Sequence, residues 1–291
     1  MAKLKDIQRK IAAVRKTMQI TRAMNMVAAA KLRKVQARAE NFAPYSEKFR
    51  EVLGNIASRI EPDIHPLLVK REEIKRSILI LFTADRGLCG NFNANLINKA
   101  EEWIKSQEEK GIKCDLILIG KKGRDYFSKR NFNIIESYVN IYGKVDIKFI
   151  NQFIDKLVGK YIAEEVDEVN MLFSRFVSML KQEPTLVKLI PVEPPNVEVT
   201  PPKSGEYVCE PAPEELLVQL LPKHISVQLM NAFLQNETSE HAARMTAMDN
   251  ATQNCSELIH DLTLLYNKAR QAAITAELMD IVGGAEALKK A

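Results

Sequence analysis

The stretch TADRGLCGNFN, residues 83–93, is where the residue types and their spacing could first support chemistry. It follows a short apolar run and precedes a helical pattern, which is where doubly wound sheets bind nucleotides. Its two glycines are Gly87 and Gly90, and this spacing matches neither GxGxxG nor GxxxxGK[ST]. A tight turn between strand and helix, with Asn91 as the candidate N-cap, is the plainer interpretation.

Other candidate motifs are weaker. The stretch GKKG at 120–123 looks like a KH-type nucleic-acid clamp, but it follows a predicted strand, so a solvated turn is favoured. No nucleophile elbow or HExxH motif is present. The thiols have no CxxC pair and read as reduced, and the histidines have no metal-ligand spacing. The sequence predicts no self-contained active site, no metal site and no cofactor of its own; these cysteines and histidines are Cys89, Cys114, Cys209, Cys255, His65, His224, His241 and His260.

The net charge of +5 is unevenly distributed along the chain. Residues 1–38 contain eleven Lys and Arg against one acid, Asp6, so this segment is +10 and the remainder is about −5 by subtraction. A basic end suggests nucleic acid, an anionic membrane or an acidic protein as partner. The alternative is the solvated side of an ordinary helix, and charge alone favours that alternative.

Both ends of the chain lack helix breakers. The first proline is Pro44, and after Pro222 no glycine occurs until Gly283. Because Gly and Pro are the strongest helix breakers, long helices are expected over 1–60 and 214–291. Pro222 is expected to kink the second helix or to begin it at 223.

Apolar residues in both end segments follow a heptad pattern. Sustained spacing of three and four residues predicts a coiled-coil seam. If the middle of the chain is a compact domain, one helix enters it and the other leaves it, so the two pair antiparallel. Polar seam positions weaken the pairing but help to fix its register. These polar positions are Thr21, Asn25 and Thr252, within seams formed by Leu4, Ile7, Ile11, Val14, Met18, Ala28, Leu32 and Val35 and by Met245, Met248, Cys255, Ile259, Leu262, Tyr266, Ala269, Ala273 and Ala276.

The middle of the chain reads as α/β. Five β-rich apolar runs alternate with helical patterns at 92–109, 121–130 and 146–162, which predicts a mainly parallel, Rossmann-like sheet over 75–192. The segment 193–213 is rich in proline and is expected to be an extended connector. The predicted strands are 77–82, 114–120, 133–139, 169–176 and 185–192.

The chain ends in ITAELMDIVGGAEALKKA, whose apolar residues spread around most of a helix. Such a segment normally lies inside a large core or a membrane. It is far shorter than the roughly 20 apolar residues that a membrane span needs, and Glu277 and Asp280 interrupt it. The residues alone therefore leave open what surrounds this segment.

Three stretches resemble the gamma subunit of F-type ATP synthases. They are ITRAMNMVAAAKLRK (20–34), SEHAARMTAMDNATQN (239–254) and YNKARQAAITAELMDIVGGAEAL (266–288). The last is similar to the family's I-T-x-E…D/E…G-A signature, and LFTADRGLCGNFN resembles the opening of the family's middle domain. The resemblance is most specific at the two ends, whereas the interior matches mainly in architecture and order.

This resemblance implies a central-stalk rotor. The coiled coil would stand inside a ring of three alpha and three beta subunits, with the α/β domain on the membrane-embedded c ring beside the epsilon subunit. Proton-driven rotation would drive conformational cycling of the beta-subunit sites, which hold the nucleotide and Mg²⁺. The subunit would then be non-catalytic, need no cofactor and meet the membrane only through the c ring. The expected location is peripheral, on the cytoplasmic face of a bacterial inner membrane.

The resemblance also carries over subunit-contact residues. Arginine forks toward acidic loops of the beta subunits are the expected geometry, and for Met24 and Gln271 coiled-coil packing is the alternative. His241 stands where many relatives have Gln, and Cys209 has no partner to form the thiol pair of the chloroplast relatives. The six expected contact residues are Met24, Arg244, Arg270, Gln271, Thr275 and Glu277.

Two other functional classes remain open from the residues alone. A nucleic-acid-binding coiled-coil adaptor is motivated by the basic N-terminal segment, although the apolar seam runs through it without stacking aromatics before Phe42. A Rossmann-type enzyme would need a cofactor and is the least favoured class.

Overall fold

The computed structural model describes residues 2–57, 65–69, 71–193 and 210–289. The chain forms two compact units, one made of residues 1–28 with 245–291 (unit 1) and the other of residues 29–244 (unit 2). The boundary between them falls within both terminal helices. The predicted domain division, with limits at 60, 75, 192 and 213, therefore differs from this grouping and stays a prediction. Most of the predicted connector, including Cys209, lies outside the described residues.

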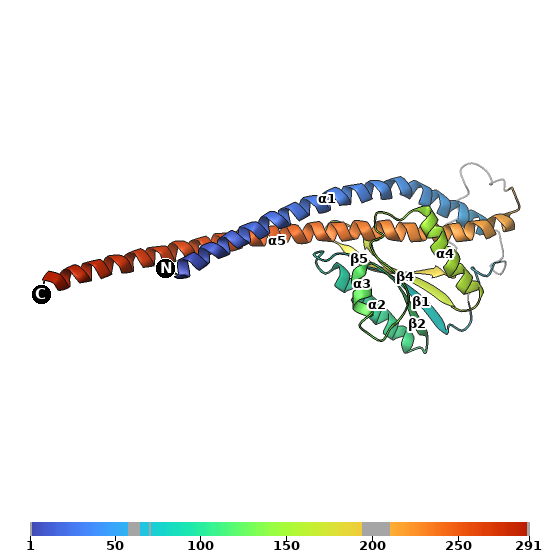
Figure 1. Ribbon diagram of the computed structural model, residues 1–291. Coiled ribbons are helices and arrows are strands. Elements are labelled where there is room, and N and C mark those ends of the chain that lie inside the picture. Colours follow the sequence, from blue (N-terminus) through green and yellow to red (C-terminus); the bar gives the residue numbers. More distant parts are fainter. Residues whose placement is uncertain (1, 58–64, 70, 194–209, 290–291) are drawn as a thin grey trace. The chain divides into compact units, whose positions relative to one another are not determined.

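Two long helices form the ends of the chain, as the scarcity of Gly and Pro predicts (Figure 1). Helix α1 covers Ala2–Ala57 and helix α5 covers Pro213–Lys289. The expectation that Pro222 kinks or begins the second helix is wrong about its start, because α5 begins at Pro213. Proline fits the first turn, and Glu214 and Glu215 favour the positive end of the helix dipole. Pro222 is kept inside α5 because its neighbours are packed in the core.

In unit 1 the two helices pair antiparallel. The hydroxyl groups of Thr21 and Thr252 are 2.8 Å apart, and Asn25 Nδ2 donates to the carbonyl oxygen of Met245 at 2.9 Å. Residue numbers rise along one helix as they fall along the other, which confirms the predicted antiparallel coiled coil. The described seam positions of α1 are buried or half-buried, and those of α5 stay so as far as Ala273. The last predicted seam position, Ala276, is exposed.

Unit 2 is built on a five-stranded sheet with the order β3-β2-β1-β4-β5. Strands β1, β2, β3 and β4 are parallel and β5 is antiparallel to β4. This arrangement confirms the mainly parallel, Rossmann-like sheet. The strands are β1 (Arg76–Phe82), β2 (Lys113–Ile119), β3 (Asn133–Tyr138), β4 (Glu168–Phe176) and β5 (Gln182–Ile190).

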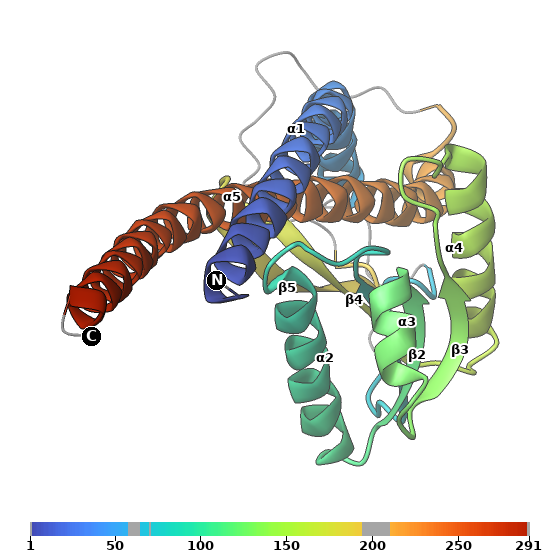
Figure 2. The same ribbon diagram turned by 60° about the vertical axis from the view of Figure 1, so that its left-hand side comes forward.

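Helices cover both faces of this sheet (Figure 2). Helices α2 (Phe92–Glu108) and α3 (Lys121–Phe127) pack with the side chains of Leu79 and Leu81 on one face. Helix α4 (Ile147–Ile162) and parts of α1 and α5 pack with Ile78, Ile80 and Phe82 on the other. Successive strand residues point to opposite faces, so the continuous apolar run of β1 is buried on both.

Within unit 2, α5 lies between α1 and the sheet. On the α1 side, the rings of Phe49 and His224 stack with centroids 6.3 Å apart. On the sheet side, Asn236 accepts a hydrogen bond from Ser174 N, and Ser239 donates to Ser174 O. The segment 224–244 is therefore covered on two sides by its own chain. Among the described helices, none has the length and apolar character of a membrane-crossing segment.

Candidate functional site: a buried arginine cluster and an exposed helix tip

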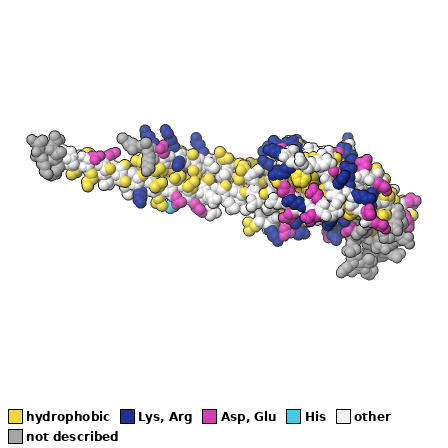
Figure 3. Space-filling view, turned by 90° about the horizontal axis from the view of Figure 1, so that it is seen from below, with side chains coloured by type: hydrophobic (Ala, Val, Ile, Leu, Met, Phe, Trp, Pro, Cys, Tyr) yellow, Lys and Arg dark blue, Asp and Glu magenta, His cyan; other side chains and the backbone are white. Residues whose placement is uncertain are grey.

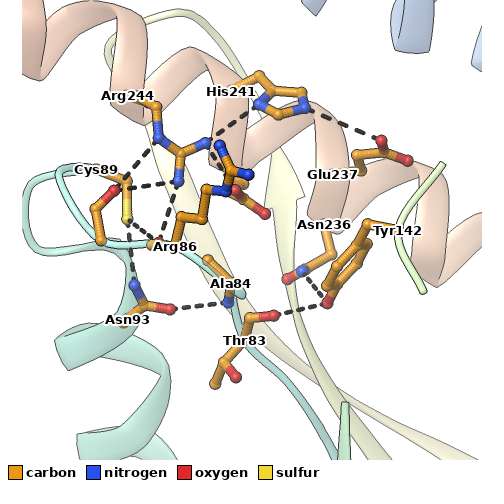
Figure 4. Close-up of polar contacts among 12 residues, drawn as sticks. Thr83, Ala84, Arg86, Cys89, Asn93, Tyr142, Asn236, Glu237, His241 and Arg244 are labelled. Atoms are coloured by element: carbon orange, nitrogen blue, oxygen red, sulfur yellow. Dashed lines mark hydrogen bonds and ion pairs between the residues drawn. The ribbon is translucent and has the colours of Figure 1, made fainter. Parts of the chain in front are cut away.

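Arg244 on α5 is the centre of a polar cluster in unit 2 (Figure 4). Its side chain is buried, and its Nη1 donates to Glu240 Oε1 at 2.7 Å. Its Nη2 donates to the carbonyl oxygen of Arg86 at 3.1 Å and, like Nε, contacts that of Gly87 at 3.3 Å. One guanidinium thus holds the loop after β1 to helix α5.

The loop held in this way, residues 83–93, is a tight turn, as its glycines predict. Leu88 and Gly90 have positive φ angles of 61° and 57°. Asn91 occupies the N-cap position of α2, as predicted, although its side chain makes no cap hydrogen bond. Asn93 orders the loop instead, because its Oδ1 accepts from Ala84 N at 2.9 Å and its Nδ2 contacts Cys89 Sγ at 3.2 Å.

The GKKG stretch is a packing turn at the start of α3. Gly120 has a φ of +100°, and a Cβ atom there would lie 2.1 Å from Thr83 O. A Cβ atom on Gly123 would lie 2.9 Å from Thr83 Oγ1. Between these buried glycines Lys121 and Lys122 are exposed, so only the lysines fit the predicted solvated turn.

Asp85 lies in the loop after β1, at the carboxyl end of the parallel strands. Its Oδ1 accepts from the backbone N–H groups of Lys121 and Asn140, both at 3.0 Å. These residues follow strands β2 and β3, so one carboxylate joins the ends of three neighbouring strands. Within the described residues, no group of His, Cys, Asp and Glu has an arrangement that could hold a metal ion.

Burial controls the ionisation of the cluster. It raises the pKa of Glu240, which Arg244 opposes, and it raises the pKa of Glu237. Burial, followed by the charges of Arg244 and Lys31, lowers the pKa of His241 to about 4. His241 is therefore neutral near pH 7, and its Nδ1 lies 3.3 Å from Arg244 Nη1. A neutral imidazole beside a guanidinium adds no charge repulsion.

The side chain of Arg244 is turned toward its own chain, and its role as a subunit contact stays a prediction. An outward fork toward a partner's acidic loop was expected, but the guanidinium is directed at Glu240 and at carbonyl groups of its own chain. Desolvation gives the physical reason, since a buried guanidinium must have its donors satisfied. The other five expected contact residues belong to unit 1.

Four of those five residues are on the exposed end of α5. Arg270, Gln271, Thr275 and Glu277 are exposed, and Thr275 Oγ1 donates to Gln271 O at 3.0 Å within the helix. Gln271 is therefore not packed in the seam of this chain, whereas Met24 is half-buried beside the seam residue Asn25. Their roles as subunit contacts stay a prediction.

The C-terminal tip, defined here as residues 274–285, is exposed along its whole length. Its apolar side chains are not confined to one stripe, and hydrophobic groups are visible on the surface of this helix end in Figure 3. The exposed fractions are 49% for Ile274, 57% for Leu278, 67% for Met279, 68% for Ile281 and 58% for Val282. No other part of the described chain covers the tip.

Sequence reasoning missed the polar residues that surround Arg244. Glu237, Glu240 and His241 precede Arg244 at spacings of seven, four and three residues, which place them on one side of a helix. That spacing was a usable signal for the ion pair. Tyr142, which donates to Thr83 O at 2.8 Å and accepts from Asn236 at 2.9 Å, gave no such signal because it comes from a distant loop.

Comparison with known proteins decides the family. A sequence model of a family described as ATP synthase matches residues 3–288. The ATP synthase gamma chain of Nitratidesulfovibrio vulgaris (strain Miyazaki F) is 49% identical over 292 residues, covering 99% of this chain and all of the relative. The chain belongs to the ATP synthase gamma chain family. The gamma chain of Syntrophobacter fumaroxidans is also 49% identical, over the full length of both chains.

Solved structures agree with the fold of the gamma chain family. A chain of the Euglena gracilis mitochondrial ATP synthase matches with a TM-score of 0.66 at 20% identity, covering 99% of this chain and 95% of its own length. A chain of the Tetrahymena thermophila mitochondrial ATP synthase central stalk and c ring matches with a TM-score of 0.59 at 21% identity, covering 80% and 99%. Family membership gives no support to the nucleic-acid-binding adaptor.

Proposed function

We propose that this chain is the central-stalk rotor subunit of an F-type ATP synthase. It couples proton-driven rotation of a membrane c ring to conformational cycling of catalytic sites on beta subunits. The observation that carries the proposal is the exposed C-terminal tip, which continues a long helix past the end of its coiled-coil partner with apolar side chains on several sides. Membership of the gamma chain family supports the same role.

The tip suits a bearing. An exposed apolar surface of this kind marks an interaction site in a soluble protein. Apolar contact is non-directional, so a helix can turn against an apolar sleeve without preferred angles. Paired charges would instead favour certain orientations. A sleeve formed by three alpha and three beta subunits would cover the tip and remove its apolar side chains from water.

The remaining partners follow from the same role. Unit 2 meets the c ring and an epsilon subunit, and the chain is peripheral on the cytoplasmic face of a bacterial inner membrane. The nucleotide and Mg²⁺ belong to the beta subunits, so this chain is non-catalytic and holds no cofactor. The absence of a membrane-crossing helix among the described residues is compatible with an indirect connection to the membrane.

The expected contact residues divide into two groups under this proposal. Arg270, Gln271, Thr275 and Glu277 are exposed and available for directed polar contacts with beta subunits. Arg244 is committed to its own chain, so we assign it the positioning of the loop that carries Arg86. Polar contacts can distinguish orientations, which a rotor must do below its apolar bearing.

Assembly tests the proposal directly. The full-length chain should join a mixture of alpha and beta subunits into a complex with ATPase activity, isolated by size exclusion and assayed for ATP hydrolysis. A variant with Ile274, Leu278 and Ile281 replaced by Ser should assemble poorly, whereas one with Leu180→Ser, which is 84% exposed in unit 2, should assemble normally. A chain that never joins the alpha–beta mixture would contradict the proposal.

A second test separates coupling from assembly. Met24→Lys places a charge beside the half-buried seam of unit 1, close to the expected acidic loops of the beta subunits, and should impair proton pumping per ATP hydrolysed more than assembly. Met24→Leu, which keeps a similar volume without a charge, is the matched control. Met26→Lys is a second control, because it places the same charge at a neighbouring residue that is 62% exposed. Equal pumping ratios in Met24→Lys and the parent membranes would count against the coupling role.

A further inference from the structure

A cavity of about 480 Å³ in unit 2 is rich in positive charge. It lies between α1, α5, the loop after β1 and the loop after β3, all within the same unit. We call it the cationic pocket. Its basic lining residues are Lys31, Lys34, Arg38, Arg86, Lys144 and Arg244.

Three acidic residues line the same pocket, and all three already have partners. Asp85 accepts two backbone N–H groups, and Glu240 is paired with Arg244. Glu237 lies 4.0 Å from Arg38 and 3.9 Å from His241. With every group except His241 ionised, the six basic and three acidic groups give the lining a net charge of +3. The acids therefore do not neutralise the pocket.

Four of the basic side chains form no ion pair within the described part of the chain. Lys31 and Lys34 come from α1, Arg86 from the loop after β1, and Lys144 from the loop after β3. The side chain of Arg86 extends toward α5 beside Arg244 (Figure 4). Isolated lysines on one helix face are usually only solvated, but charges from three separate segments around one cavity repel one another and favour a shared counter-ion.

The place of the pocket in the fold is a second, independent observation. In open α/β sheets, ligands bind outside the carboxyl ends of the parallel strands. Asp85 and Arg86 follow β1, and Asn140 and Lys144 follow β3, so the pocket lies at that end of the sheet. Asp85 already places one carboxylate against backbone N–H groups there. This end of the sheet is organised to hold negative charge.

We propose that the cationic pocket binds a phosphate-bearing anion, either inorganic phosphate or the phosphate groups of a nucleotide. Its volume lies within the range of roughly 300–1,000 Å³ typical of small-ligand sites. Lys and Arg supply the charge-assisted hydrogen bonds that phosphate oxygens accept. A small anion can contact groups from three segments at once, which an extended acidic segment of a partner protein would do less completely.

Such a ligand would act as a cross-link inside unit 2. It would connect Lys31 and Lys34 of α1 with the loops that carry Arg86 and Lys144. Because anion binding stabilises the state that binds it, these segments should become more protected when the pocket is filled. The site and this effect do not depend on the proposed rotor function.

Calorimetric titration of the full-length chain at low ionic strength tests the site. The probes are inorganic phosphate, pyrophosphate and ADP, each compared with chloride at equal ionic strength. Lys34→Gln should weaken binding about tenfold, because it removes one charged contact. Arg33→Gln is the matched control, since this exposed neighbour does not line the pocket and loses the same charge. Its affinity should equal that of the parent chain.

The three probes identify the source of the phosphate. Equal affinity for phosphate and ADP would assign a free-phosphate site, whereas tighter binding of ADP than of pyrophosphate would assign a nucleotide site. Hydrogen exchange should show added protection at 31–38 and 140–144 with the bound probe. No binding of any probe at millimolar concentration, or equal loss in both variants, would overturn the proposal. Binding of oligoglutamate alone would assign the pocket to an acidic protein segment and also overturn it.

The outcome can be separated from that of the proposed function. A chain that joins the alpha and beta subunits but binds no phosphate probe would contradict only the anion site. A chain that binds phosphate through Lys34 but does not assemble would contradict only the rotor function.

Discussion

Two stretches of the same helix, α5, both carry large apolar side chains but have opposite surroundings. Residues 224–244 in unit 2 are mostly buried, including Ile225, Leu229 and Phe233. Residues 274–285 in unit 1 are all exposed. The first stretch lies between α1 and the sheet, whereas nothing in the described chain covers the second. A helix that is apolar on several sides must be buried by something, so the second stretch needs a covering that this chain does not provide.

Polar residues in the two stretches follow the same difference. In the buried stretch two amide side chains bond to the backbone of β4, as Asn236 accepts from Ser174 N and Gln235 accepts from Phe176 N, while His224 Nδ1 and Gln228 Oε1 have no hydrogen-bond partner within the described residues. In the exposed tip Glu277 and Asp280 face water. Buried polar groups need such partners because desolvation without a hydrogen bond is costly. The buried stretch thus finds packing partners within its own chain, whereas the tip finds none in the described part of the chain.

The largest expected effect comes from breaking the buried stretch at Phe233. Its ring packs edge-on against Phe82 with centroids 5.0 Å apart and also contacts the rings of Tyr142 and Phe149. Phe233→Ala should lower the free energy of unfolding of unit 2 by about 3–5 kcal/mol. Urea denaturation followed by the fluorescence of the single tryptophan, Trp103, measures this. The control Met279→Ala should change stability by less than about 0.5 kcal/mol.

The next effect comes from the buried ion pair. Arg244→Leu leaves Glu240 buried without its partner and releases the loop carbonyls of Arg86 and Gly87. We expect the substitution to lower the free energy of unfolding by about 3 kcal/mol at pH 8. The loss should be smaller at pH 5, because burial raises the pKa of Glu240 and protonation removes the unpaired charge. Unfolding midpoints at the two pH values measure the difference; an equal loss at both would contradict a buried charge.

A pH effect of somewhat smaller size is expected from His224. Burial, followed by the charge of Arg50, lowers the pKa of His224 to about 4 from its usual value of 6.5. The unfolded chain takes up a proton below pH 6.5 that the folded chain refuses, so stability is complete above pH 6.5 and falls as the pH drops toward 4. The largest decrease in the free energy of unfolding that His224 alone can cause is about 3 kcal/mol.

His224→Phe tests that origin. The variant keeps an aromatic ring against Phe49 and removes the titrating group, together with a buried Nδ1 that has no hydrogen-bond partner among the described residues. Unfolding of unit 2 should therefore depend less on pH between 6.5 and 4 in the variant than in the parent. His241, whose pKa is also lowered, should still contribute to the pH dependence of the free energy of unfolding in the variant. The raised pKa values of Glu237 and Glu240 oppose this contribution in the same pH range. An unchanged slope would exclude His224 as a source.

Periodic patterns predicted the elements of this fold well. The heptad seam from Ile11 to Val35 and the five apolar runs each follow a local period that fixes which face is buried. The predicted start of the second helix at Pro222 was wrong, because the effect of this proline on the helix depends on packing against the core and not on the local sequence. The same limit applies to Arg244, because the loop that carries its acceptors Arg86 O and Gly87 O is distant in sequence.

The contact residues on the exposed end of α5 were predicted for a different reason, and their roles stay a prediction. Their contact roles came from a motif at the chain end, and the structure adds that the side chains of Arg270, Gln271 and Glu277 are exposed. The cationic pocket could not be read from sequence, because Lys31, Arg86 and Lys144 lie in three segments that only the tertiary fold brings together. Residues that come together only in the tertiary fold produce no periodic pattern in the local sequence.

The smallest expected effect on the free chain comes from Ile281, and it gives the sharpest test of the comparison. Its side chain is 68% exposed, so Ile281→Ser should change the stability of the isolated chain by less than about 0.5 kcal/mol. In the assembled complex the same residue should be buried, and losing about 1.5–3 kcal/mol of burial would weaken assembly roughly ten- to hundredfold. Comparing denaturation of the free chain with titration onto alpha and beta subunits separates the two. Unchanged assembly would mean that the tip stays exposed in the complex, and the apolar bearing would then have no basis.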